Sequence, residues 1–259
     1  MNNIKKILVP IDFSETAHNA LQYVAGLIRS SQEIEVTLLH ISSSDLSQES
    51  KEAIESQLAD LINQYSELIP NCKPRVESGS LVETIISVHS DQDSELIIMG
   101  TQGSQDENRE TNTSKLVLEA DCPVLVIPDN QKGFSIKNIA LALGSSTIDN
   151  SEGLQALHDI ARTFDATVHV LTINRNGEGL TVKEENQEVL EYYLESLLYF
   201  YAFPQNSDIE LGISDYVEEH NIDMLAILPR NHTRTTKPSE GRLTKLLTMH
   251  TKVPLLTID

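Results

Sequence analysis

The sequence predicts an α/β protein made of two similar domains, each a five-stranded parallel sheet with helices on both faces. The first observation behind this prediction is an internal repeat, because three segments recur in the same order at nearly constant spacing. The recurring pairs are IKKILVPID (4–12) and IKNIALALG (136–144), SELIIMG (94–100) and DMLAILP (223–229), and DCPVLVIPD (121–129) and KVPLLTID (252–259). The second observation is that short apolar runs alternate with segments of helical period, which is typical of strand–helix–strand units. The polar stretch PDNQKGFS (128–135) separates the copies and predicts domains at 1–130 and 131–259.

The first copy contains its expected elements in a clear order. An apolar run at 4–12 predicts a strand, and Ser14 and Glu15 predict the start of the helix that follows it. A helix over 49–68 has apolar residues on one face and charges on the other. The other expected elements are strands at 35–41, near 74–79, at 95–100 and at 123–128, and helices at 81–91 and 114–120.

The second copy predicts strands in the corresponding places, at 139–143, 167–173, 224–228 and 254–258, with a short third strand in DIELG (208–212). The segment EVLEYYLESLLYFYAFP (188–204) is interpreted as a helix and holds half of the aromatic residues of the chain. On a helix these residues would be spread around more than one face. Part of them would pack in the core, and the remainder would form a surface for the other half or for another chain.

Composition limits the classes of function. The formal net charge of −20 argues against binding to nucleic acid or to an anionic membrane. The two cysteines, Cys72 and Cys122, are too few for a disulfide framework and favour the reducing cytoplasm. No apolar run reaches the roughly 18 residues of a membrane span, and the first is too short for a signal peptide. The sequence has no GxSxG, GxxxxGK[ST], HExxH or CxxC-type set, so we expect no catalytic residue and no metal ligand.

The combination of ILVPIDFSETAHNAL (7–21), LLHI (38–41), LIIMGTQG (96–103) and CPVLVIP (122–128) resembles the universal stress protein family in its tandem form. The resemblance covers the first half closely and the second half mainly in its strand order and its ending. It implies Rossmann-like (adenine nucleotide alpha hydrolase-like) domains in which strand 1 lies beside strand 4, strands 2 and 3 follow on one side, and strand 5 lies on the other. It also implies that the two domains pair through their fifth strands as a pseudo-dimer.

The same resemblance implies an adenine-nucleotide site where the strand order reverses, between strands 1 and 4. Nucleotide-binding members of the family carry a glycine, two residues, a second glycine, nine residues, and a third glycine followed by serine or threonine. An aspartate after strand 1 and a backbone contact after strand 2 complete the pocket. The residues that match these positions are Asp12, Ile41, Gly100, Gly103, Thr111 and Thr113.

The first-half pattern departs from the family at the third glycine, whose place is taken by Glu110 after a loop of six residues. A carboxylate about 4 Å from a phosphate repels it by roughly 1 to 4 kcal/mol, depending on the local dielectric. A bound Mg²⁺ would reverse that effect, so ATP or AMP, with Mg²⁺, is the expected ligand of a weakened site. The alternative is that Gly100 ends a strand, Gly103 turns the chain and Asp12 caps a helix, with no ligand.

The second half has Gly144 in place of the aspartate, and Pro229, His232 and Gly241 in place of the three glycines. Proline fixes φ and lacks the N–H donor that a phosphate needs, so we expect no ATP site there. The surrounding stretch LPRNHTRTTKPSEGR (228–242) is the most basic part of the chain. It would be a solvated loop, an anion site made by side chains, or an electrostatic latch onto an acidic face of the other half.

Together these observations predict a non-enzymatic cytoplasmic stress-response protein. Its first domain would hold a weak adenine-nucleotide site, and its second would act as a scaffold or regulator. Two tandem chains would form a homodimer. One alternative is an interaction protein that binds no nucleotide in either domain, and a slow ATPase ranks last.

Overall fold

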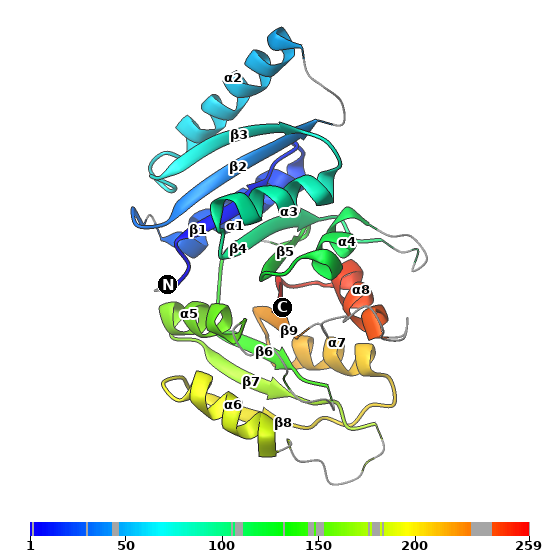
Figure 1. Cartoon of the computed structure of the whole chain (residues 1–259). Helices are drawn as coiled ribbons and strands as arrows, with labels where there is room; N and C mark the ends of the chain where they lie inside the picture. Colours follow the sequence, from blue (N-terminus) through cyan, green and yellow to red (C-terminus); the bar gives the residue numbers. More distant parts are fainter. Residues whose placement is uncertain are drawn as a thin grey trace.

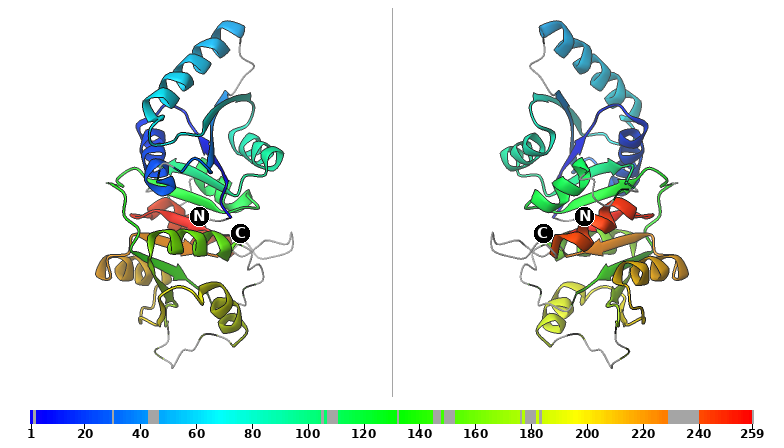
Figure 2. Two further views of the ribbon diagram at one scale, coloured as in Figure 1. Left: turned by 90° about the vertical axis from the view of Figure 1, so that its left-hand side faces the viewer. Right: turned by 90° about the vertical axis from the view of Figure 1, so that its right-hand side faces the viewer.

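The computed structural model describes the chain except for residues 2, 30, 43–46, 105, 107–110, 132, 145–147, 149–152, 176, 178–181, 183, 229–239 and 259. The described residues form three layers, with one ten-stranded sheet between two layers of helices (Figure 1). The first domain occupies one end of the molecule and the second domain the other, as the two side views also show (Figure 2).

The strands and helices alternate in both halves, as the sequence predicts. The first half consists of β1 (Lys6–Pro10), α1 (Glu15–Ile28), β2 (Glu35–Ser42), α2 (Gln48–Tyr65), β3 (Cys72–Ser78), α3 (Leu81–Gln92), β4 (Leu96–Thr101), α4 (Asn112–Glu119) and β5 (Val124–Pro128). The second half consists of β6 (Asn138–Ala142), α5 (Leu154–Phe164), β7 (Thr167–Leu171), α6 (Glu184–Leu194), β8 (Tyr199–Ala202), α7 (Ile209–Glu219), β9 (Met224–Ile227), α8 (Glu240–His250) and β10 (Leu255–Thr257). The connection between β5 and β6, at 129–137, includes most of the polar stretch expected to separate the domains.

The sheet order is β3-β2-β1-β4-β5-β10-β9-β6-β7-β8. Each half therefore has the order 3-2-1-4-5 that the family resemblance implies, with parallel neighbours throughout. The halves join through their fifth strands, where β5 and β10 are antiparallel and Leu256 pairs with Leu125. The pairing removes two apolar edges that would otherwise be exposed to other chains.

Two hydrophobic clusters cover the two faces of the sheet. One contains buried residues of α1, α2, α5 and α6, and the other contains buried residues of α3, α4, α7 and α8. This matches the expectation of helices on both faces, because strands buried on both sides consist almost entirely of apolar residues. In β5, for example, all five residues are buried.

Two expectations for the second half are wrong. DIELG (208–212) is the start of α7, where Asp208 is the N-cap and accepts from the amide of Leu211 at 3.0 Å. The third strand is instead β8, within the segment expected to be a single helix. That helix ends at Leu194, and the uncharged residues Tyr199–Ala202 pair with β7. Aromatic residues fit a pleated surface well, and in this short run that preference overrides the helical period of the preceding residues.

The domains also meet outside the central strands. Helices α4 and α8 pack against one another on one face of the sheet. On the other face, Phe134 from the connection lies between Tyr23 of α1 and Phe164 of α5, with ring centroids 4.9 and 5.1 Å apart. The position of Gly26 in α1 permits this contact, because a β-carbon there would lie 2.4 Å from the Phe134 ring.

Candidate functional site

The candidate site lies at the carboxyl ends of β1, β2 and β4 in the first domain. The strand order reverses between β1 and β4, since β2 follows β1 on one side and β5 follows β4 on the other. At such a point the connections leave the sheet in opposite directions and open a crevice. The N-terminus of α4 is held at the same edge, because Thr113 Oγ1 in its first turn donates to the carbonyl of Gly100, in β4, at 3.4 Å.

Asp12 is exposed and lies between the end of β1 and the start of α1. Its Oδ1 accepts a hydrogen bond from the amide of Ser14 at 3.0 Å, and Ser14 caps α1 by accepting from Ala17. The capping role expected of Ser14 is confirmed. Asp12 thus has a local structural role in addition to the role that the family resemblance implies.

Ile41 is half-buried near the end of β2 and pairs in register with Glu77 of β3. Its neighbour His40 ties β2 to the end of β1, because its Nδ1 lies 2.9 Å from the carbonyl of Ile11. The His40 ring also stacks on Phe13, whose φ of 61° is in the left-handed region. These contacts fix the turn that carries Asp12 beside the end of β2.

Gly100 is required by the packing of α1 on β4. A β-carbon at this position would lie 2.5 Å from the main-chain oxygen of Thr16. Any larger residue would therefore push α1 away from the sheet. This contact explains the glycine whether or not a ligand binds.

Gly103 contacts the second domain. Its φ is +66°, and a β-carbon there would lie 2.2 Å from the main-chain oxygen of Met249 in α8. The amide of the next residue, Ser104, donates to the same oxygen at 3.4 Å. The loop after β4 is therefore part of the interface between the domains as well as part of the candidate site.

Thr111 is the N-cap of α4, which begins two residues earlier than the helix expected at 114–120. Its side chain accepts from the amide of Ser114 at 3.0 Å, and Ser114 Oγ accepts from the amide of Thr111 at 3.0 Å, which completes a capping box. Thr113 is buried, and its hydroxyl is used by the bond to Gly100. Of the two hydroxyls, that of the half-buried Thr111 is the more accessible to a ligand.

Several amides of the loop already have acceptors. Gly103 N donates to Thr101 Oγ1 at 3.1 Å, and Asp106 N donates to Ser104 Oγ at 3.2 Å. The main-chain oxygen of Met249 also lies beside the loop. It belongs to the last turn of α8, which is the negative end of that helix dipole. Both features lower the affinity of this loop for an anion, in the same direction as Glu110, which itself lies outside the described residues.

Sequence reasoning did not identify Thr16, Gln102 and Met249 as neighbours of the site. Gln102 Nε2 donates to Thr16 Oγ1 at 3.2 Å, which links the loop to α1. Gln102 is part of the GTQG motif, so its position was visible in the sequence. The contact with Met249 joins residues far apart in the chain and has no local sequence signal.

The corresponding place in the second domain is built differently. Gly144 is exposed after β6, and Gly241 lies inside the first turn of α8 instead of in a loop before it. By strand register Leu228, and not Pro229 as expected, corresponds to Gly100, because Met224 pairs with Ile139 as Leu96 pairs with Ile7. Pro229, His232 and most of the basic stretch lie outside the described residues. The residue before α8 also lies outside the described residues, so the start of this helix cannot be compared with the cap at Thr111.

Other ionisable groups have structural roles. Burial, with a smaller contribution from His220, lowers the pKa of His169, whose Nδ1 lies 3.0 Å from the hydroxyl of Tyr216. Burial raises the pKa of the Cys72 thiol to about 12, which disfavours the reactive thiolate. Within the described residues, no cluster of three or more potential ligands could hold a metal ion. None of the helices in that part of the chain is long and apolar enough to cross a membrane.

Known proteins similar to this chain share its fold. The model of the Universal stress protein family matches residues 3–128. The first half of the chain is a universal stress protein domain. No curated protein sequence matches the chain.

Solved structures of other proteins are similar to this chain over its whole length, and two of them illustrate this. A universal stress protein from Archaeoglobus fulgidus shares 16% identity, with 99% of each chain covered and a TM-score of 0.74. A putative universal stress protein from Pseudomonas aeruginosa shares 18% identity, with 99% of this chain and 93% of that chain covered and a TM-score of 0.67. At these identities the similarity concerns the fold, which in both matches includes the two halves together.

Proposed function

We propose that the chain is a non-enzymatic stress-response protein that binds one adenine nucleotide weakly in its first domain. Membership of the first half in the universal stress protein family supports the stress-response role. The observation that carries the nucleotide site is the start of α4, capped by Thr111 and bonded to Gly100 at the point where the strand order reverses. A helix N-terminus at such a point attracts phosphate through its unpaired amides and its dipole.

In this proposal Asp12 and the backbone of Ile41 hold the nucleoside, while Gly100, Gly103 and Thr111 lie around the phosphates. Thr113 supports the loop by its bond to Gly100. Weak affinity is expected because the amides of Gly103 and Ser104 must exchange existing acceptors for phosphate oxygens. The second domain, which lacks the matching residues, acts as a scaffold or regulator.

Binding would be linked to the interface between the domains. Ser104 N and the α-carbon of Gly103 lie against the carbonyl of Met249, so a ligand that draws the loop toward a phosphate weakens the contact with α8. By linkage, a partner that displaces α8 would change nucleotide affinity by the same factor. This is how a protein without turnover would report its nucleotide state.

Calorimetric titration of the full chain with ATP and with AMP, each with and without Mg²⁺, tests the proposal. We expect one nucleotide per chain, and a loss of affinity of about tenfold or more in Asp12→Ala. Asp129→Ala, at an exposed position after β5, is the matched control and should bind as the wild type does. Unchanged affinity in Asp12→Ala would rule out the site, and measured hydrolysis of ATP would contradict the non-enzymatic role.

A second candidate is an interaction protein that binds no nucleotide. The observation in its favour is that each of the six matching residues except Ile41 has a contact or hydrogen bond that explains it without a ligand. Absence of heat and of thermal stabilisation at millimolar ATP and AMP would favour this candidate.

A further inference from the structure

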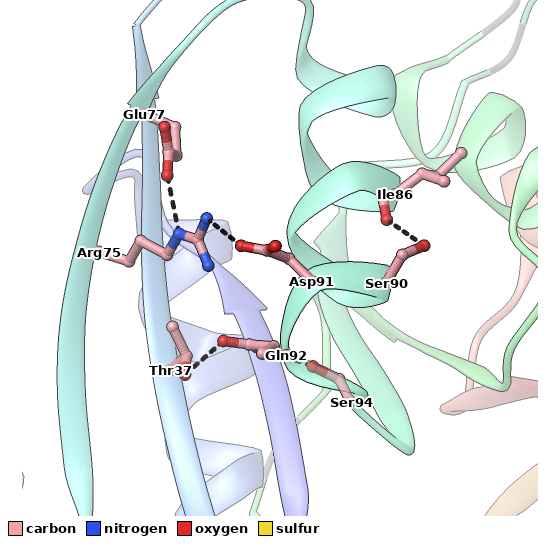
Figure 3. A network of polar contacts seen from close by, with 8 residues as sticks. All are labelled: Thr37, Arg75, Glu77, Ile86, Ser90, Asp91, Gln92 and Ser94. Carbon is pink, nitrogen blue, oxygen red and sulfur yellow. Dashed lines mark hydrogen bonds and ion pairs between the residues drawn. The ribbon is translucent and has the colours of Figure 1, made fainter.

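The ion pair that joins β3 to α3 in the first domain has no counterpart among the described residues of the second. In the first domain, Arg75 extends from the edge strand β3 toward α3 (Figure 3). Its Nη2 lies 3.0 Å from Asp91 Oδ2 on α3, and its Nε lies 2.8 Å from Glu77 Oε1 on β3. The guanidinium therefore joins the edge strand to the helix that covers it.

Strand register identifies the residue that corresponds to Arg75 in the second domain. Arg75 pairs with Leu39 of β2, and Leu39 pairs with Pro10 of β1. In the second domain, Leu171 pairs with Ala142 of β6, the repeat of Pro10, and the partner of Leu171 on the edge strand is Ala202. An alanine thus occupies the position of the arginine.

The acidic partner is retained. Asp91 lies as many residues before the start of β4 as Glu219 lies before the start of β9, so the two residues correspond. Two features confirm this alignment of α3 with α7. Asp93 and Asn221 both have left-handed backbone, with φ of 52° and 49°. Glu95 and Asp223 both accept from amides of the first strand of their domain.

The result is an open groove between β8 and α7, with a volume of about 410 Å³. Its lining includes Phe200, Ala202, Asp215, Tyr216, Glu219 and His220, and none of the described residues that line it is a lysine or an arginine. Asp215 Oδ2 accepts from the side-chain Nδ2 of Asn206 at 3.3 Å, while no ion pair between described residues involves Asp215 or Glu219. The exposed ring of Phe200 stands at the position that Lys73 takes in the first domain.

The edge strand beside the groove, β8, can also pair with a further strand. Among the described residues β8 is the last strand of the sheet, and its sequence, YFYA, has neither charge nor proline. The opposite edge, β3, has both, which is how edge strands resist unwanted pairing. Ala202 O accepts from the amide of Thr172, the residue after β7, so Tyr201, the residue before Ala202, directs its amide and carbonyl to the free side.

We propose that this groove binds an arginine residue presented by an extended segment of a partner protein. The segment pairs with the free side of β8, and its guanidinium takes the place that Arg75 fills in the first domain. Glu219 and Asp215 accept its N–H groups, and the exposed ring of Phe200 flanks its planar face. The net charge of −20 favours a basic partner over a second copy, whose own carboxylates would be brought to the same edge.

Fluorescence polarisation of the full chain with a labelled peptide, Thr-Val-Thr-Arg-Thr-Val-Thr, tests this proposal. The control peptide carries citrulline, which has the shape of arginine without its charge. We expect one peptide per chain, with binding weakened about tenfold or more by citrulline and to a similar extent by Glu219→Gln. Glu218→Gln removes the same charge on the other side of α7, where it pairs with Lys252, and should leave peptide affinity unchanged.

Further measurements identify what binds in the groove. Ala202→Arg supplies the guanidinium within the chain, so it should abolish peptide binding and raise the melting temperature. Adding Glu219→Gln to this variant should cancel the rise in melting temperature. Equal binding of both peptides, or unchanged binding in Ala202→Arg, would overturn the proposal. Binding of acetyl-arginine amide as tightly as the peptide would exclude the strand pairing, and self-association abolished by Ala202→Arg would assign the groove to a second copy.

Discussion

Gly103 of the first domain lies against the main-chain carbonyl of Met249 in the second domain. The contact is so close that a β-carbon at Gly103 would be 2.2 Å from that oxygen, and the backbone there has a φ of +66°. A glycine that the family resemblance assigns to phosphate binding thus also joins the two domains. A substitution at Gly103 is therefore expected to affect the contact between the domains as well as the candidate site.

The first prediction concerns this contact. Gly103→Ala should destabilise the chain, because the methyl group clashes with Met249 and alanine disfavours a positive φ. Gly133→Ala is the matched control, since Gly133 has a φ of +70° and no atom within 4 Å of its β-carbon position. The control should cost about 1 kcal/mol, and Gly103→Ala a further 1–3 kcal/mol, measured by urea unfolding. Equal costs would show that the loop moves freely away from Met249.

The second prediction concerns the start of α4. Thr111→Ala removes both hydrogen bonds that the hydroxyl makes with Ser114, so the free energy of unfolding should fall by about 1 kcal/mol. Thr111→Ser keeps the hydroxyl and should restore most of the loss. If the serine variant is as unstable as the alanine variant, the methyl group and not the cap is the source of stability.

The third prediction concerns pH. His169 has a pKa below its ordinary value, mainly because it is buried, so folding favours the neutral ring. The stability this gives is present above the unfolded-state pKa of about 6.5 and is lost as the pH falls below it toward the lowered folded-state pKa. His169→Thr, which copies Thr37 at the same register position, should unfold with a weaker dependence on pH between 7.5 and 5.5. Parallel slopes for the two proteins would contradict the assignment.

The fourth prediction concerns Glu110 and is based on the sequence. Replacing this carboxylate should strengthen binding of ATP, and the gain should be largest without Mg²⁺, because the ion offsets the repulsion. Glu110→Gln removes the charge alone, whereas Glu110→Gly also restores the residue of the family pattern. Calorimetry should give an increase of about tenfold for the first and more for the second. No increase in either variant would show that Glu110 does not face the ligand.

The sequence predicted most of the architecture because its signals are local and repeated. Apolar runs such as ELIIMG and PVLVIP are strands, and the order of the two copies is preserved in the sheet. The pairing of fifth strands followed from the resemblance, and β5 and β10 do pair. The third strand of the second half was missed because YFYA directly follows an amphipathic helix and is only four residues long.

The candidate site was only partly predictable, for a physical reason. Ser14 and Thr111 cap helices, and that property depends on residues within one turn. The close approaches of Gly100 to Thr16 and of Gly103 to Met249 depend on how helices pack on the sheet. The same holds for the groove beside Ala202, since the alanine becomes informative only when strand register aligns it with Arg75.

The most direct test of the central claim is a titration of the ¹⁵N-labelled full chain with AMP and with ATP plus Mg²⁺, followed by the amide resonances of its glycines. We expect the resonances of Gly100 and Gly103 to shift in a saturable manner, while those of Gly144 and Gly241, in the second domain, stay unchanged. Shifts at Gly144 and Gly241, or no shift at Gly100 and Gly103 at millimolar nucleotide, would contradict it.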